Sequence, residues 1–213
     1  NDGAFGITGD CGEINAEEVE LLENHKFEDI RTLFWRNSEL DFNSPAELLK
    51  SLEEKPDQDW LRRIHECEDE KILKLILKDN NKLVENIDKN KLKILWECCQ
   101  IPDFVKKNYG HHLEVVSKVF SFLNGKERKI TNSYMKQQLS VLNKLEGNVD
   151  SLSNRIANVR TWSYVSNKAN WVENQDYWIE RTKSLEDKLS DRLHEELTKS
   201  FIDKRASILA RGL

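Results

Sequence analysis

The histidines and cysteines are the side chains of this chain best suited to metal binding or nucleophilic chemistry, and their spacing favours neither. His111 and His112 are adjacent. Neighbouring positions on a helix point about 100° apart, so these two rings do not bind one metal together. The simpler interpretation is one half-buried ring and one exposed ring. Cys98 and Cys99 are also adjacent, and no pair of cysteines has the C-x-x-C spacing of a zinc or redox site. The sequence predicts no metal site and reduced thiols.

No group of residues has the pattern of an active site. His65 and Cys67 are close in sequence, but no second histidine or orienting residue accompanies them. His194 lacks the partner histidine, four residues further on, of a zinc-protease helix. The early glycines follow G-x-x-G-x-x-G without the Lys-Ser/Thr that completes a phosphate-binding loop. We therefore predict no catalytic residues and no cofactor bound by this chain alone.

Aromatic and basic side chains are concentrated in NVRTWSYVSNKANWVENQDYW, residues 158–178. Interleaved basic and aromatic residues are typical of surfaces that stack on the bases of single-stranded RNA. Tryptophans also bury the most area of any side chain, so for them we favour a place in the core, whereas for the arginines both interpretations stay open. A helix dipole alone would explain the basic residues near the C-terminus. The candidate RNA-binding residues are Arg155, Arg160, Trp162, Tyr164, Asn167, Lys168, Lys204 and Arg205.

Charge and composition limit the classes of function. The chain has 213 residues, 33 of them basic and 38 acidic, and a formal net charge of −5. Proteins that bind nucleic acid through an extended face are usually basic, so any RNA contact is expected to be local or shared with another part of the protein. No apolar run reaches the ~18 residues of a membrane span, and no signal peptide is evident. We expect a cytoplasmic protein with no membrane partner.

The spacing of apolar residues predicts an all-α fold, an irregular array of many helices. After residue 12 the chain has few glycines and prolines, which favours long helices. Residues 4–8 are expected to form a short strand, which cannot stand alone and would belong to a sheet formed upstream. A short helix is expected to carry Ile30, Leu33, Phe34 and Trp35. Further helices are expected to begin at residue 15 and to span residues 45–54, 59–67, 68–79, 82–87, 91–100, 111–123, 133–145, 150–166 and 176–210, the last as one helix or two.

Three segments of the chain resemble superfamily 2 RNA helicases of the mitochondrial-degradosome type. NDGAFGITGD, followed by LENHKF and LFWRNSELDF, is similar to the segment just after the last ATPase motif of those helicases. LWECCQIPDF resembles a second signature of the bacterial members. RTWSYVSNKANW, continuing through LSDRLHEELTKSFIDKRASIL, resembles a third. The resemblance covers essentially the whole chain and is weakest over residues 125–150.

The resemblance implies a piece of a modular enzyme. Residues 1–14 would be the tail of the second RecA-like helicase lobe, 15–124 a helical domain, and 125–213 a C-terminal helical subdomain with a long terminal helix. In the full-length protein, two RecA-like lobes would bind ATP and Mg²⁺, and the helical region would help to enclose one RNA strand. This chain contains no GxxxxGK[ST], no DE-x-H box and no GRxGR motif, so it is expected neither to hydrolyse ATP nor to unwind RNA alone.

Two functions of different classes remain open. The first is an accessory region of a bacterial, cytoplasmic RNA helicase, with single-stranded RNA and its own RecA-like lobes as partners. The second is an all-helical docking module for a ribonuclease or another partner in RNA degradation. A docking module is expected to expose an apolar patch, here predicted around Leu73, Ile76 and Leu77. A free-standing enzyme is the least favoured interpretation.

Overall fold

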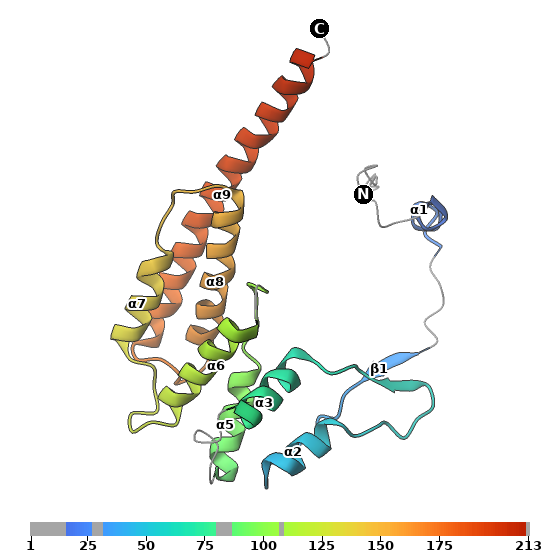
Figure 1. Cartoon of the computed structure of the whole chain (residues 1–213), viewed down its shortest axis with the longest axis vertical. Helices are drawn as coiled ribbons and strands as arrows, with labels where there is room; N and C mark the ends of the chain where they lie inside the picture. The colour runs from blue at the N-terminus through green and yellow to red at the C-terminus, as the bar shows by residue number, and fades with distance from the viewer. Residues whose placement is uncertain (1–15, 27–31, 80–86, 107–108, 212–213) are drawn as a thin grey trace. The chain divides into compact units, whose positions relative to one another are not determined.

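A computed structural model describes residues 16–26, 32–79, 87–106 and 109–211 (Figure 1). The strand predicted at residues 4–8, the helix predicted at 82–87 apart from its last residue, and the side chains from residue 203 onward lie outside this description. The chain divides into two compact units, residues 1–37 with 54–64 and residues 38–53 with 65–213. The structure is mostly helical, with 64% helix and 5% strand, which confirms the predicted all-α array.

Among its described residues, the first unit has one helix and two short strands: α1 (Ala16–Glu23), β1 (Leu33–Trp35) and β2 (Leu61–Arg63). The strands pair in parallel, with Leu33 opposite Leu61. The sequence predicts helices over both strand segments, and both predictions are wrong. Each segment is too short for helical periodicity to show, and the large apolar residues of β1 suit an extended strand.

In the described residues of the second unit, the first helices contribute to one core: α2 (Pro45–Leu52), α3 (Glu68–Asp79), α5 (Lys89–Cys99) and α6 (Tyr109–Leu123). Side-chain caps specify where two of them start. The Ser44 hydroxyl accepts a hydrogen bond from the Glu47 backbone N–H at 3.2 Å and so begins α2. The Asp88 carboxylate accepts from the backbone N–H groups of Lys91 and Asn90, both at 2.9 Å, and begins α5. These two bonds lower the pKa of Asp88.

Further along the described part of the second unit lie α7 (Asn132–Leu142), α8 (Val149–Asn167) and α9 (Gln175–Arg211). Helices α8 and α9 form an antiparallel hairpin, and α9 continues past the first turn of α8 (Figure 1). Leu152 and Val159 of α8 and Leu185 and Leu189 of α9 are buried between the helices. The last 37 helical residues form a single helix, which decides between the two alternatives that the sequence left open.

A short parallel bridge joins the start of α7 to the turn between α8 and α9. The Ile130 N–H donates to the Trp171 carbonyl at 2.8 Å, and the Glu173 N–H donates to the Ile130 carbonyl at 3.0 Å. The Trp178 indole donates to Asn132 Oδ1 at 2.8 Å, and the Asn132 backbone N–H donates to the Glu173 carboxylate, also at 2.8 Å. The polar stretch at residues 125–129 therefore lies inside one packed unit.

The apolar patch expected on α3 is absent. Leu73 and Ile76 are fully buried, and Leu77 packs against the core, because α2, α5 and α6 contact this helix. The prediction of a docking surface around these residues is wrong. Large exposed apolar side chains occur instead on the last part of α9, at Leu197 and Phe201, which are 47% and 60% exposed.

Candidate nucleic-acid interface

Three of the predicted RNA-binding residues lie on one face of α8, and a fourth, Lys168, caps its C-terminal end. Arg160, Tyr164 and Asn167 are spaced by four and three positions, and side chains at i, i+4 and i+7 follow one side of a helix. The Arg160 side chain is 55% exposed, and Asn167 is also exposed, whereas Tyr164 and Lys168 are half-buried. The structure therefore brings these four residues together at the C-terminal end of α8, where Arg160 to Asn167 span about 10 Å of helix.

The two cations among these residues are held by neighbouring groups. Arg160 Nε donates to Glu186 Oε1 of α9 at 2.8 Å. Lys168 Nζ lies 5.1 Å from the Tyr164 ring centroid and 5.8 Å from that of Trp171. An ammonium group over aromatic faces keeps its N–H donors available at the outer side while the rings fix its position. Within the described residues, only the Nε of the Arg160 guanidinium is paired, so its two terminal nitrogens remain as donors.

Arg155 and Trp162 have structural partners instead. Arg155 Nη1 donates to the carbonyls of Lys144 and Glu146, at 2.9 and 2.5 Å, and so fixes the loop before α8. Trp162 is 4% exposed and packs edge-on against Tyr134, with ring centroids 5.8 Å apart. Almost none of its ring is exposed on the surface of α8, so we exclude it from the RNA-facing residues of that helix. The backbones of residues 204 and 205 belong to α9, but the side chains of Lys204 and Arg205 lie outside the described part.

The tryptophans of residues 158–178 belong to the core. Trp162, Trp171 and Trp178 are 4–6% exposed, as the core interpretation predicts. Trp60 of the first unit differs, with 56% of its surface exposed. The aromatic concentration near the C-terminus is therefore explained mainly by the packing of α7, α8 and α9.

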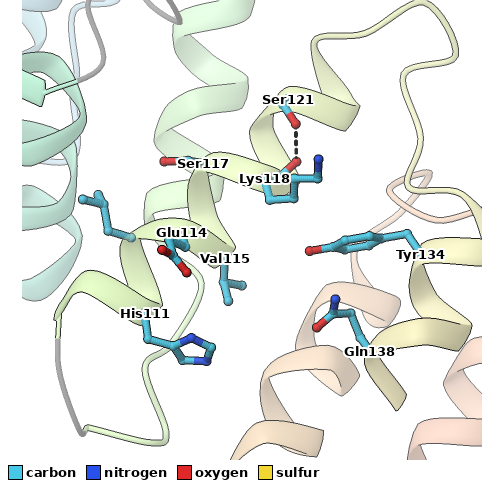
Figure 2. Close-up of a pocket in the computed structure, with 9 residues that line it drawn as sticks. His111, Glu114, Val115, Ser117, Lys118, Ser121, Tyr134 and Gln138 are labelled. Atoms are coloured by element: carbon cyan, nitrogen blue, oxygen red, sulfur yellow. Dashed lines mark hydrogen bonds between the residues drawn. The ribbon is translucent and has the colours of Figure 1, made fainter. Parts of the chain in front are cut away.

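A groove between α6 and α7 was not predicted from the sequence. It has a volume of about 540 Å³. Figure 2 shows Tyr134 and Gln138 extending from α7 toward the α6 side, where His111, Val115 and Lys118 lie. Burial raises the pKa of the Tyr134 hydroxyl, which keeps it protonated. The groove thus combines an aromatic ring, an amide, the Lys118 cation and the Glu114 carboxylate.

A smaller pocket of about 170 Å³ shares His111, Val115 and Gln138 with this groove and reaches α8. His112, 6% exposed, forms part of its wall. Burial lowers the pKa of the His112 imidazole, while nearby Asp103 acts in the opposite direction. The expected division of the histidine pair is seen, because His111 is exposed and His112 is buried. Sequence reasoning missed the pocket because its polar residues come from separate segments of the chain.

The buried thiols are poor nucleophiles. Cys67, Cys98 and Cys99 are free cysteines, and burial raises the pKa of the Cys98 and Cys99 thiols. Among the described residues, no three His, Cys, Asp or Glu side chains are arranged to hold a metal ion. Nor does any helix in that part of the chain have the length and apolar character to cross a membrane.

Comparison of the chain with protein-family models, with curated proteins and with solved structures finds no match.

Proposed function

We propose that this chain is the accessory C-terminal region of an ATP-dependent RNA helicase, which helps to enclose and guide single-stranded RNA against RecA-like ATPase lobes. The observation that carries the proposal is the resemblance of three segments, in the same order, to helicases of the mitochondrial-degradosome type. ATP and Mg²⁺ would bind the lobes and not this chain, and a ribonuclease is a further partner of such an enzyme. Bacterial cytoplasm is the corresponding location.

Two of the resembling segments contribute to the core of this chain. LWECCQIPDF spans residues 95–104 and supplies buried side chains at Leu95, Trp96, Cys98, Cys99 and Ile101. RTWSYVSNKANW spans residues 160–171 and forms the end of α8 with the turn that follows. Both segments therefore contain residues that determine packing.

The α8 face supports a local RNA contact despite the net charge of −5. Arg160 on the exposed face of α8 and Lys168 at the C-terminal cap of that helix supply two cations, and the Lys168 ammonium lies 5.1 Å from the ring centroid of Tyr164. Phosphates bind cations of this kind, and a nearby aromatic ring stabilises the lysine in place. We propose these residues, with Asn167, as the strand-facing surface.

Fluorescence anisotropy with a short, labelled single-stranded RNA tests this surface. The unsubstituted chain is titrated at several salt concentrations, and the affinity is plotted against salt on logarithmic axes. Each lost phosphate contact lowers the slope by about 0.7 for a single strand, so the double variant Arg160→Ala, Lys168→Ala should lower it by roughly 1.4.

The matched control is Lys91→Ala, Lys93→Ala, which removes the same charge from α5 of the same unit. Its slope should equal that of the unsubstituted chain. If the two double variants had the same slope of RNA affinity against salt concentration, the proposal that the α8 surface contacts RNA would be refuted. If the chain binds no RNA even at low salt, it would need the RecA-like lobes in order to hold the strand. The same two double variants would then be made in the full-length enzyme, and their rates of RNA-stimulated ATP hydrolysis would be compared.

The exposed end of α9 favours the docking module as a second candidate. Leu197, Phe201 and Ile202 are 47–60% exposed on a helix that has left its hairpin partner. Such a group of apolar side chains is typical of a protein contact. In a binding assay with a purified exoribonuclease and without RNA, Phe201→Asp should abolish binding, whereas Thr198→Asp on the neighbouring turn should have a small effect. Equal binding by both variants would count against this candidate.

A further inference from the structure

The smaller pocket, at the junction of α6, α7 and α8, has the size of a single ring. Its volume of about 170 Å³ is close to that of a cavity of roughly 150 Å³ that holds one benzene molecule. Val115, Leu142 and Trp162 give it apolar walls. A larger molecule can place only one flat ring inside it.

Several polar atoms around these walls have no partner among the described residues. The side-chain amide of Gln138 makes no hydrogen bond there, and Asn158 donates Nδ2 to the Asn154 carbonyl at 2.8 Å while its Oδ1 stays unpaired. In the described part, the one fully buried side-chain polar atom without a partner is Ser117 Oγ, which lines the larger groove and not this pocket. The unpaired atoms of Gln138 and Asn158 are therefore accessible from the pocket or its mouth. Amide donors and acceptors of this kind match the edge of a heterocycle.

The charge of the pocket selects against phosphate. Its described lining contains no lysine or arginine, and Asp103 is its carboxylate. Asp103 Oδ1 accepts from the backbone N–H groups of Val105 and Lys106, at 3.1 and 3.0 Å, which fixes the carboxylate at one end of the site. Burial lowers the pKa of the His112 imidazole and so favours its neutral form, while Asp103 and the backbone of Ile101 act in the opposite direction. A neutral ligand is compatible with these groups, whereas an anion beside Asp103 is repelled.

We propose that this pocket binds one neutral, planar heterocycle of the pyrimidine-base type, with the ring against Trp162 and its polar edge on Gln138, Asn158 and His112. The base could belong to a free nucleoside or to a nucleotide of an RNA strand. A strand in the groove of Figure 2 could reach the pocket, because the two share His111, Val115 and Gln138. This second source rests on the proposed function.

Nuclear magnetic resonance of the ¹⁵N-labelled chain tests the pocket directly. Uridine is added, and the side-chain amide resonances of Gln138 and Asn158 are followed. We expect saturable shifts of both, with a dissociation constant of roughly millimolar order, as befits a ligand with so few contacting atoms. The absence of saturable shifts at about tenfold higher concentration would overturn the proposal.

Three variants separate the pocket from non-specific binding. Gln138→Leu should weaken uridine binding about tenfold, because one polar edge of the base loses its partner. Gln137→Leu, the same change at the adjacent exposed position, should leave it unchanged. Val141→Trp changes a residue that is 64% exposed at the pocket, so it should block the site without disturbing the core. Unchanged affinity in Val141→Trp, or equal loss in the two glutamine variants, would contradict the assignment.

Two further ligands identify the bound group and its source. Ribose 5-phosphate should cause no shift, and shifts equal to those from uridine would show a phosphate site and overturn the proposal. A short single-stranded RNA that displaces uridine supports a base supplied by a strand. Uridine binding without displacement supports the pocket with a free nucleoside as its ligand. If uridine binds and RNA does not bind the chain at all, the pocket is supported and the proposed RNA contact of α8 is not. If RNA binds and uridine does not, the pocket is refuted and the proposed function survives.

Discussion

Replacing Trp162 by alanine separates a role in the core from a role on an RNA surface. The side chain is 4% exposed and packs edge-on against Tyr134. A buried tryptophan removes roughly 150–250 Å² from water, which at about 25 cal/mol per Å² amounts to roughly 4–6 kcal/mol, and an edge-to-face pair adds about 0.5–1.5 kcal/mol. The denatured chain already buries part of this area. We therefore expect the free energy of unfolding to fall by about 3–5 kcal/mol, the usual range for such truncations.

Urea denaturation followed by circular dichroism measures this loss. The matched control is Trp60→Ala, which removes the same side chain from a position that is 56% exposed and should change the unfolding free energy by less than about 1 kcal/mol. The two variants should differ by at least about 2 kcal/mol, a gap that linear extrapolation resolves. If Trp162→Ala unfolded at the urea concentration of the unsubstituted chain while losing RNA affinity, the ring would serve the surface and the burial argument would fail.

Three smaller perturbations test other parts of the second unit. Gly147 has φ +132°, and an added Cβ would lie 3.1 Å from the Ser151 Cβ. Gly147→Ala should therefore lower the free energy of unfolding by roughly 1–3 kcal/mol. The melting temperature should fall by about 2–4 °C for each kcal/mol lost. Burial lowers the pKa of His112 in the folded state, so the contribution of its neutral ring to the free energy of unfolding should be complete above about pH 6.5, the pKa of an unfolded histidine, and should decline as the pH falls through that value. Unfolding curves of His112→Gln recorded at several pH values should lack this component. An unchanged pH dependence of stability in that variant would contradict the assignment. Ser44→Ala removes the cap of α2 and should cost about 1 kcal/mol in urea denaturation, whereas Ser44→Asp should retain most of the stability.

The long helices could be predicted because their apolar periodicity extends over many turns. The sequence places one helix at residues 68–79, the bounds of α3, and another at 150–166, within one residue of α8 at each end. Their buried faces are regular, so local pattern and final packing agree. The same argument explains why the tryptophans of residues 158–178 were correctly favoured for the core.

The strands and the exposed surfaces could not be predicted in this way. β1 and β2 are each three residues long, and each becomes extended through pairing with a segment distant in the sequence. Leu73 and Ile76 are buried because three other helices cover them, which the pattern of α3 alone does not reveal. Of the candidate RNA residues, the helix period groups Arg160 with Asn167, but it does not show that Arg155 holds two loop carbonyls.

The bridge between Ile130 and Val172 has a consequence for the order in which this protein folds during synthesis. Closing a loop of roughly 40 residues costs chain entropy before its contacts form, and such contacts slow folding. The start of α7 leaves the ribosome well before Trp178, whose indole binds Asn132. On a nascent chain, α7 therefore lacks its final partners until the α8–α9 turn and the first turns of α9 have emerged. Translation must run far into α9 before this part of the core can close, so α7, α8 and α9 are expected to acquire their native packing in one late, concerted step.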